Sequence, residues 1–174
     1  MEELAESLMI PLKGLPKGES SFNFAIDGKF FQKFGNTRIN EADCSVKAKV
    51  VRTSSMVSIK CTVGGFVVVE CDRCLDDLTL KVDVERELKV GFGSVDINGN
   101  GDEEDIIVVS SSDPEVSIDQ FVYDYVCLSL PLVMVHPEGR CNPDMLARMG
   151  VAAETTEKEQ GVSPFGKLKE MLKK

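Results

Sequence analysis

The sequence predicts an α+β fold: a predominantly antiparallel β-sheet with one main helix packed on it and a short C-terminal helical tail. Three observations predict this class. Apolar and polar residues alternate through most of residues 20–90, which is the period of a strand with one face buried and one in water. Residues 118–128 carry their apolar side chains at helical spacing instead, and residues 164–174 set three apolar side chains against lysines.

The strands follow from this alternation, in the segments 22–26, 44–50, 57–63 and 78–90. Asp27 and Gly28 come before a short segment, 29–34, whose three Phe could share one helical face. The pair Gly64-Gly65 predicts a tight hairpin between the strand 57–63 and a strand at 66–70.

After residue 90 the pattern changes. Residues 91–101 are rich in Gly and Asn and predict a loop, and 106–109 a short apolar strand. Ser117 and Gln120 have the spacing of a capping box before the helix 118–128, and Pro131 ends that helix. We expect a single domain over 1–150, a polar linker over 151–163 and a basic amphipathic tail over 164–174.

The chain is acidic, with 20 Lys plus Arg against 29 Asp plus Glu and a net charge of −9. No basic residue lies between Lys89 and Arg140, a stretch with ten carboxylates, so the rest of the chain sums to +1. Such a stretch is either a solvated surface or an attraction for a basic partner, such as a ribosomal protein. Binding to bare nucleic acid is disfavoured because it depends on Lys and Arg, which cluster only in the tail, where contact with rRNA is conceivable.

The compartment predicted is the cytoplasm. The first six residues are acidic where a secretory signal is basic and then apolar, and no apolar run reaches the length of a membrane span. Thiols stay reduced there, so six cysteines do not imply a disulfide framework. Cys44, Cys61 and Cys127 lie singly in apolar segments and are interpreted as packing residues.

The motif with the most chemistry is Cys71-Asp72-Arg73-Cys74, because two cysteines two residues apart at a strand end can present both sulfurs to one metal ion. His136, the only histidine, and Cys141 could complete a tetrahedral structural Zn²⁺ site. The long gap between Cys74 and His136 leaves open free thiols and a solvent-facing histidine. A thiol–disulfide site is a further alternative, but it would need Cys71 at a helix N-terminus, and strand segments flank it.

Other chemistry is not favoured. Asp96, Asn98 and Asn100 match half of a Ca²⁺-binding EF-hand loop, but Ile107 stands where its bidentate Glu belongs, so an acidic loop is the better interpretation. With one histidine, no phosphate-binding loop and no dinucleotide motif, we predict no enzyme and no small-molecule substrate.

Several of these features together resemble the YceD family, the large ribosomal RNA subunit accumulation proteins. They are the Cys71–Leu75 centre before a long alternating strand, the acidic insertion, the helix running into Leu130-Pro131-Leu132, His136 and Cys141, and the tail opening at Pro164-Phe165. The resemblance spans about residue 66 to the end. It implies a bacterial cytoplasmic protein needed for accumulation of large-subunit rRNA, with no catalytic residues to carry over.

Together these observations predict a non-enzymatic factor in large-subunit ribosome biogenesis, which binds a basic ribosomal protein, a pre-ribosomal particle or rRNA and holds a structural zinc. Two alternatives remain at this point. One is a thiol–disulfide oxidoreductase using Cys71 and Cys74, and the other is a zinc-stabilised interaction module unrelated to ribosomes.

Overall fold

In the computed structural model, the residues described are 7–16, 18–53, 56–93, 105–110 and 112–150. The chain divides into two compact units, Met1–Cys141 and Asn142–Lys174. The predicted linker (151–163), the tail (164–174) and the EF-hand-like segment (96–102) lie outside the described residues. The predicted single domain over 1–150 therefore remains a prediction.

The first unit is built on a five-stranded sheet in the order β2-β3-β4-β5-β6. The strands are β2 (Gly18–Asp27), β3 (Ile39–Arg52), β4 (Met56–Glu70), β5 (Asp77–Phe92) and β6 (Asp105–Val109). The first four are antiparallel neighbours, whereas β6 runs parallel to β5, with Asp105 beside Leu88. The α+β class is confirmed, and β6 makes the sheet mixed.

The alternation along the strands separates a buried face from a wet one. On β3, Cys44, Val46, Ala48 and Val50 are buried while the residues between them are exposed. The register continues this across the sheet, since Val46 pairs with Val63 and Val63 with Val84, all three buried. Burial of this apolar row, at roughly 25 cal/mol per Å², is the main stabilisation of the sheet.

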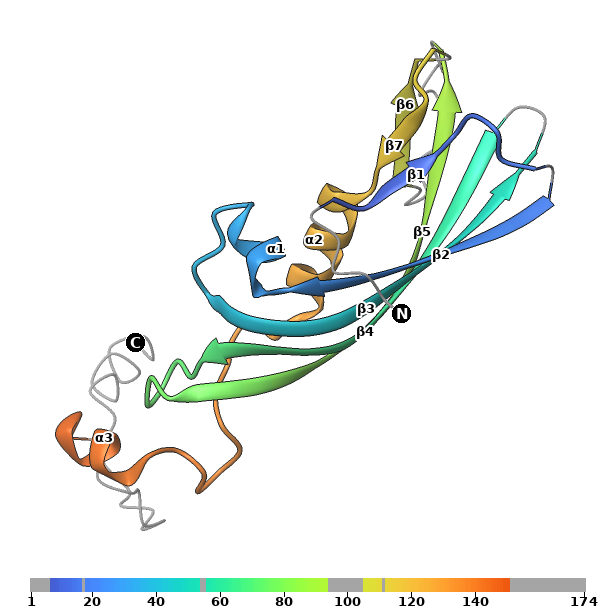
Figure 1. Ribbon diagram of the computed structural model, residues 1–174. Helices are drawn as coiled ribbons and strands as arrows, with labels where there is room; N and C mark the ends of the chain where they lie inside the picture. Colours follow the sequence, from blue (N-terminus) through green and yellow to red (C-terminus); the bar gives the residue numbers. More distant parts are fainter. Residues whose placement is uncertain (1–6, 17, 54–55, 94–104, 111, 151–174) are drawn as a thin grey trace, which may run out of the picture. The chain divides into compact units, whose positions relative to one another are not determined.

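Two helices cover the buried face of the sheet, α1 (Gly28–Gln32) and α2 (Asp119–Ser129), as Figure 1 shows. Asp27 caps α1 by accepting hydrogen bonds from the backbone N–H of Lys29 and Phe30. The ring of Phe34, two residues after α1, stacks on that of Tyr123 of α2 with centroids 4.3 Å apart. The predicted helix 118–128 is confirmed as α2, which packs mainly against β5.

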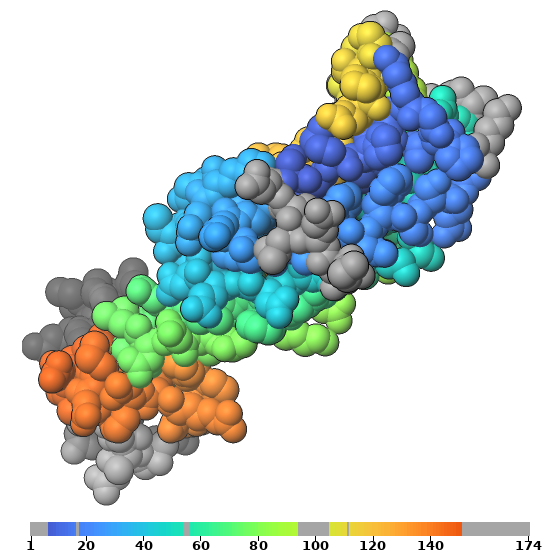
Figure 2. All heavy atoms as spheres, viewed as in Figure 1, coloured from blue at the N-terminus to red at the C-terminus, as the bar shows by residue number. Residues whose placement is uncertain are grey.

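A second, two-stranded sheet pairs β1 (Met9–Pro11) with β7 (Glu115–Ser117) and was not predicted. Buried Asp119, the first residue of α2, holds it in place. Its carboxylate accepts hydrogen bonds from the Leu8 N–H at 2.5 Å and the Ser7 hydroxyl at 2.9 Å, and its Oδ2 lies 2.7 Å from the Lys33 Nζ. In the space-filling view, the blue residues of β1, β2 and α1 lie side by side on the face of the first unit that is turned toward the viewer (Figure 2).

The hairpin predicted at Gly64-Gly65 is wrong, because β4 runs through both glycines without a turn. Gly65 allows a close approach between β3 and β4 instead. A Cβ at Gly65 would lie 2.1 Å from the Asp43 carbonyl oxygen, and the φ of Gly65 is +152°, which side chains other than hydrogen rarely adopt.

The predicted capping box is not formed, because the N-cap of α2 is Ile118, whose side chain makes no cap hydrogen bond. Ser117 belongs to β7, and its hydroxyl accepts a hydrogen bond from the Asp119 N–H at 3.3 Å. The Gln120 side chain donates to Asp124 rather than back to Ser117, because Asp124 lies one helical turn away on the same side of α2.

The second unit contains α3 (Pro143–Arg148), whose first turn is capped by the Asn142 side chain accepting from the Asp144 N–H at 3.0 Å. Within the described residues, no helix has the length and apolar character needed to cross a bilayer.

Candidate metal centre

The turn between β4 and β5 places the sulfurs of Cys71 and Cys74 on the same side. The Cys71 N–H donates to the Asp76 carbonyl and the Leu75 N–H donates to the Cys71 carbonyl, both at 2.9 Å, which closes the turn around the first cysteine. Leu75 has a φ of +63°, the one positive φ among the described residues other than glycine. This left-handed residue lets the chain turn back into β5 directly after Cys74.

Asp72 fastens the segment that follows α2 to this turn. Its N–H donates to the Met134 carbonyl at 2.7 Å, and its carboxylate accepts from the Met134 N–H at 2.6 Å. The other carboxylate oxygen of Asp72 lies 2.8 Å from the Arg38 guanidinium. Met134 is thereby held two residues before His136, which brings the segment 134–141 alongside the turn.

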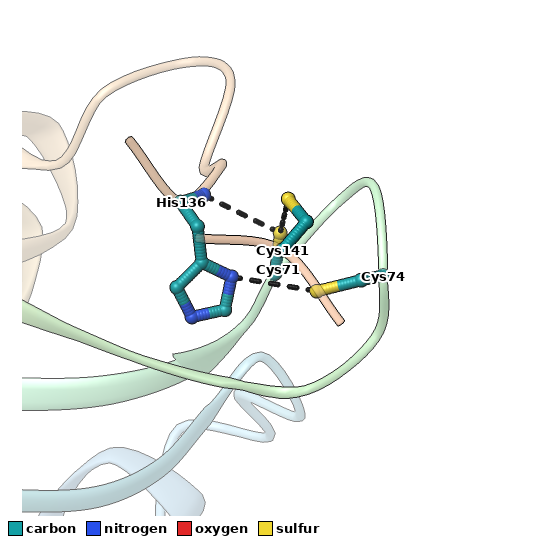
Figure 3. A group of neighbouring side chains, drawn as sticks. All are labelled: Cys71, Cys74, His136 and Cys141. Carbon is teal, nitrogen blue, oxygen red and sulfur yellow. Dashed lines mark hydrogen bonds between the residues drawn. The ribbon is translucent and has the colours of Figure 1, made fainter. Parts of the chain in front are cut away.

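The structure brings together all four residues singled out in the sequence, Cys71, Cys74, His136 and Cys141, and their ligand atoms lie within 4.8 Å of one another. Figure 3 shows Cys71 and Cys74 coming from the β4–β5 turn and His136 and Cys141 from the later segment. The sulfurs of Cys71 and Cys141 are 4.0 Å apart, and the Cys74 sulfur is 3.4 Å from Nδ1 of His136. All three cysteines are buried.

The orientation of His136 selects its ligand nitrogen. Nε2 lies 3.1 Å from the carbonyl oxygen of Asp77, which can only accept, so Nε2 carries the proton. In the neutral ring Nδ1 is then unprotonated, with its lone pair toward Cys74. Histidines that bind metal are commonly held by a carbonyl in this way.

The members of the cluster, together with nearby backbone groups, shift one another's pKa values. Burial opposes the Cys71 thiolate, but the N–H groups of Cys74, Arg73 and His136 point at the sulfur and lower the Cys71 pKa to about 6. A hydrogen bond with Cys71 raises the pKa of His136. Burial and the neighbouring sulfurs of Cys71 and Cys74 raise the pKa of Cys141. The pKa of each of these groups therefore depends on the charge of the others, which is expected of side chains arranged around one site.

The remaining cysteines lie apart from this cluster. Burial raises the pKa of Cys44 to about 11 and that of Cys61 to about 12, so both thiols stay protonated within the core. Burial also raises the pKa of Cys127, which is half-buried on α2. Packing is the role that these environments favour.

Two members of the site escaped the sequence analysis. Asp72 lies between the cysteines, and nothing in its spacing marks it as the residue that binds the segment of Met134. The Asp77 carbonyl orients His136, and a backbone group carries no sequence signal. An acidic residue inside the Cys71–Cys74 motif was the one available clue.

Comparison with known proteins decides the family. A family model described as large ribosomal RNA subunit accumulation protein YceD matches residues 59–172, about two thirds of the chain, and includes all four clustered residues. The chain belongs to the YceD family. Neither curated proteins nor solved structures gave a match.

Membership confirms the resemblance seen in the sequence over nearly the same residues. The YceD description implies a role in the accumulation of large-subunit rRNA and names no catalysed reaction.

Proposed function

We propose that this YceD protein is a cytoplasmic, non-enzymatic factor in large-subunit ribosome biogenesis that promotes accumulation of large-subunit rRNA. The family match over residues 59–172 carries this proposal. Two physical features support a mechanism: the Cys71–Cys141 cluster and the acidic stretch between Lys89 and Arg140.

The cluster binds a structural Zn²⁺ through Cys71, Cys74, Nδ1 of His136 and Cys141. In a tetrahedral site with Zn–S near 2.3 Å and Zn–N near 2.05 Å, sulfurs are about 3.8 Å apart and a sulfur lies about 3.6 Å from the nitrogen. Two of the six separations here, 4.0 and 3.4 Å, are close to these values, and all six lie within 4.8 Å. Four protein ligands leave no open position, which is the pattern of structural rather than catalytic zinc.

Zinc would act as a second clamp beside Asp72, joining the β4–β5 turn to the segment 134–141. The ligands come from parts of the chain about sixty residues apart, so metal binding would stabilise the folded chain relative to the unfolded one. The zinc site would then make the β4–β5 turn and the segment 134–141 rigid, and other surfaces of the protein would recognise the partner.

A basic ribosomal protein, alone or in a pre-ribosomal particle, is the partner we propose for the acidic stretch. Of its ten carboxylates, Asp119 is buried and paired with Lys33, so it is not available to a partner. Glu115 and Glu138 are exposed, and Asp113 and Asp124 are half-exposed. In this proposal the lysines at 167, 169, 173 and 174 contact rRNA.

The thiol–disulfide alternative rests on the low pKa of Cys71. Against it, Cys71 and Cys74 are buried and follow a strand, with no helix N-terminus at the motif. Alkylation distinguishes the two hypotheses. In a redox protein, Cys71 reacts in the protein as isolated, whereas in a zinc protein it reacts only after the metal has been chelated.

The function is tested by depleting the protein from cells and measuring the ratio of large- to small-subunit rRNA, with a gradient profile. We expect a selective loss of the large subunit, restored by the wild-type chain. An unchanged ratio would overturn the proposed function and leave the alternative of a zinc-stabilised module unrelated to ribosomes.

A further inference from the structure

Among the three cysteines of the cluster, Cys141 lies closest to water. It is 8% exposed, whereas Cys71 and Cys74 are 0% exposed. Residues 138–140, which come directly before Cys141, are all exposed, so the chain reaches this cysteine along the surface. Exposure is one of the factors that govern the oxidation of a cysteine. A small oxidant such as hydrogen peroxide therefore meets the sulfur of Cys141 first.

Cys71 lies where its sulfur can attack an oxidised Cys141. The two sulfurs are 4.0 Å apart, although one belongs to the β4–β5 turn and the other to the segment 134–141. Asp72 holds these two segments together, since both its N–H and its carboxylate bond to the backbone of Met134. These contacts involve protein groups alone, so they persist when a metal leaves. Two sulfurs held in this way react with each other as an intramolecular pair.

Cys74 has a different neighbour. Its sulfur lies 3.4 Å from Nδ1 of His136, as Figure 3 shows. A disulfide from Cys71 to Cys74 would join two residues of one turn and would add no link to the segment 134–141. A disulfide from Cys71 to Cys141 would join the same two segments that zinc would join, so it would preserve the arrangement of the chain around the centre.

We propose that hydrogen peroxide converts the zinc centre into a zinc-free form with a disulfide between Cys71 and Cys141. Peroxide oxidises the Cys141 thiolate to a sulfenic acid and leaves hydroxide. The Cys71 thiolate then attacks the Cys141 sulfur, the S–S bond forms, the S–O bond breaks and a second hydroxide leaves. Two thiolates thus lose two electrons to peroxide, and two protons from solvent convert the hydroxides to water. Zn²⁺ leaves because Cys74 and His136 alone supply two of four ligands.

This exchange is a redox-sensitive device within the metal centre, and the inference rests on the proposed zinc site. The cytoplasm that we propose for this protein keeps thiols reduced. Cellular thiols would therefore reduce the disulfide by thiol–disulfide exchange, and zinc would bind again. Oxidation would change the metal content of the protein while the β4–β5 turn stays joined to the segment 134–141.

The test treats the full-length, zinc-loaded protein with hydrogen peroxide and measures released zinc with a chromogenic chelator. We expect one zinc released per chain, an intact mass of the denatured chain lower by about 2 Da, and a Cys71–Cys141 cross-link in a non-reducing peptide map. Dithiothreitol should restore both the mass and zinc binding. Retained zinc, a Cys71–Cys74 link or sulfinic acids without a cross-link would overturn the proposal.

Cys74→Ser tests the pairing on the metal-free chain. It keeps both proposed partners, so peroxide should give the same Cys71–Cys141 cross-link, and loss of that link would overturn the pairing. In the wild type, the disulfide closes a loop of 70 residues. The oxidised protein should therefore have a higher Tm than the reduced protein after chelation. Equal Tm values would contradict the claim that the disulfide replaces zinc as a clamp.

Asp72→Ala tests whether Asp72 holds the two sulfurs together. We expect the ratio of Cys71–Cys141 disulfide to sulfinic acid to fall about tenfold at excess peroxide, because the pair is no longer held close. Asp77→Ala is the matched control: its side chain is exposed, and its backbone carbonyl, which contacts His136, is retained. Equal ratios in the two variants would overturn this step.

The zinc site, the proposed function and this inference fail in different ways. A chain that binds no zinc at all would refute the zinc site and the exchange with it. Zinc that is bound but retained under peroxide would overturn the exchange alone. A normal rRNA ratio after depletion would refute the proposed function and leave zinc release and the cross-link unaffected.

Discussion

At the scale of the residue, Leu75 is held in a conformation that its side chain disfavours. With φ at +63° and the side chain 59% exposed, it gains little from packing to offset the left-handed backbone. Such a conformation costs a residue with a Cβ about 1–2 kcal/mol relative to glycine. The strain lies next to the proposed metal ligand Cys74, where the turn needs it.

Leu75→Gly is therefore expected to raise the free energy of unfolding by about 1 kcal/mol, measured by urea denaturation of the full chain. Leu132→Gly is the matched control. Leu132 is 97% exposed and has no positive φ, so the change should give no gain. If Leu75→Gly destabilised the protein as much as the control, the strain at Leu75 would be refuted.

At this scale, the types of the residues were enough to predict the members of the candidate site. Cys71, Cys74, His136 and Cys141 combine thiolates with one imidazole, which is the ligand chemistry of zinc. Spacing alone could not decide whether they converge across the gap from Cys74 to His136, because Asp72 and the backbone of Met134 produce this convergence. Long-range contacts of this kind leave no periodic signal in the sequence.

At the scale of the element, Gly65 explains how closely the paired strands β3 and β4 approach each other. The Asp43 carbonyl occupies the position that a Cβ would take. Gly65→Ala should therefore cost about 3 kcal/mol of unfolding free energy.

Gly64→Ala is the neighbouring control, since nothing lies within 4 Å of its Cβ position and its φ is ordinary. It should change stability by no more than about 0.5 kcal/mol. Thermal denaturation of both variants checks the difference, and similar losses would contradict the close approach.

Asp119 joins three elements, and its ionisation is tied to folding. Burial would raise the Asp119 pKa, but Lys33, the Leu8 N–H and the Ser7 hydroxyl outweigh it and hold the pKa below the ordinary 3.8. A lowered pKa contributes stability that is fully present above 3.8 and is lost as pH falls through the folded value.

Asp119→Asn should then cost about 2 kcal/mol at pH 7, with the difference from the wild type shrinking in acid. Urea denaturation across pH measures this. Asp124→Asn on the same helix, where the carboxylate accepts from Gln120 at the surface, should have little effect at any pH. A pH-independent loss at Asp119 would show that its charge is not the cause.

Elements with a recognisable apolar pattern could be predicted from the sequence, including the short α1 and β6, whereas the two three-residue strands could not. The alternation of 78–90 and the helical spacing of 118–128 correspond to β5 and α2. β1 and β7 have three residues each, too few for a period, and their pairing depends on Asp119. Gly64-Gly65 was mistaken for a turn because close strand approach and a tight hairpin both require glycine.

At the scale of the whole molecule, rigidity and the proposed recognition of a partner belong to different parts of the chain. Asp72 and the cluster fix the segment after α2 to the β4–β5 turn. Asp83 and Glu85 of β5 pair with Lys81 and Lys60, whereas Glu115 and Glu138 of the acidic stretch are exposed and are the carboxylates that we propose for a basic partner. Buried Asp119 is an exception that the net charge of −9 does not reveal.

We propose that Cys71, Cys74, His136 and Cys141 together bind one zinc ion. Native mass spectrometry of the protein purified without added metal tests it most directly. We expect one zinc per chain, retained in Cys127→Ser, lost in Cys71→Ser and removed by a chelator with a fall in Tm. A metal-free chain whose Tm a chelator leaves unchanged would contradict the claim.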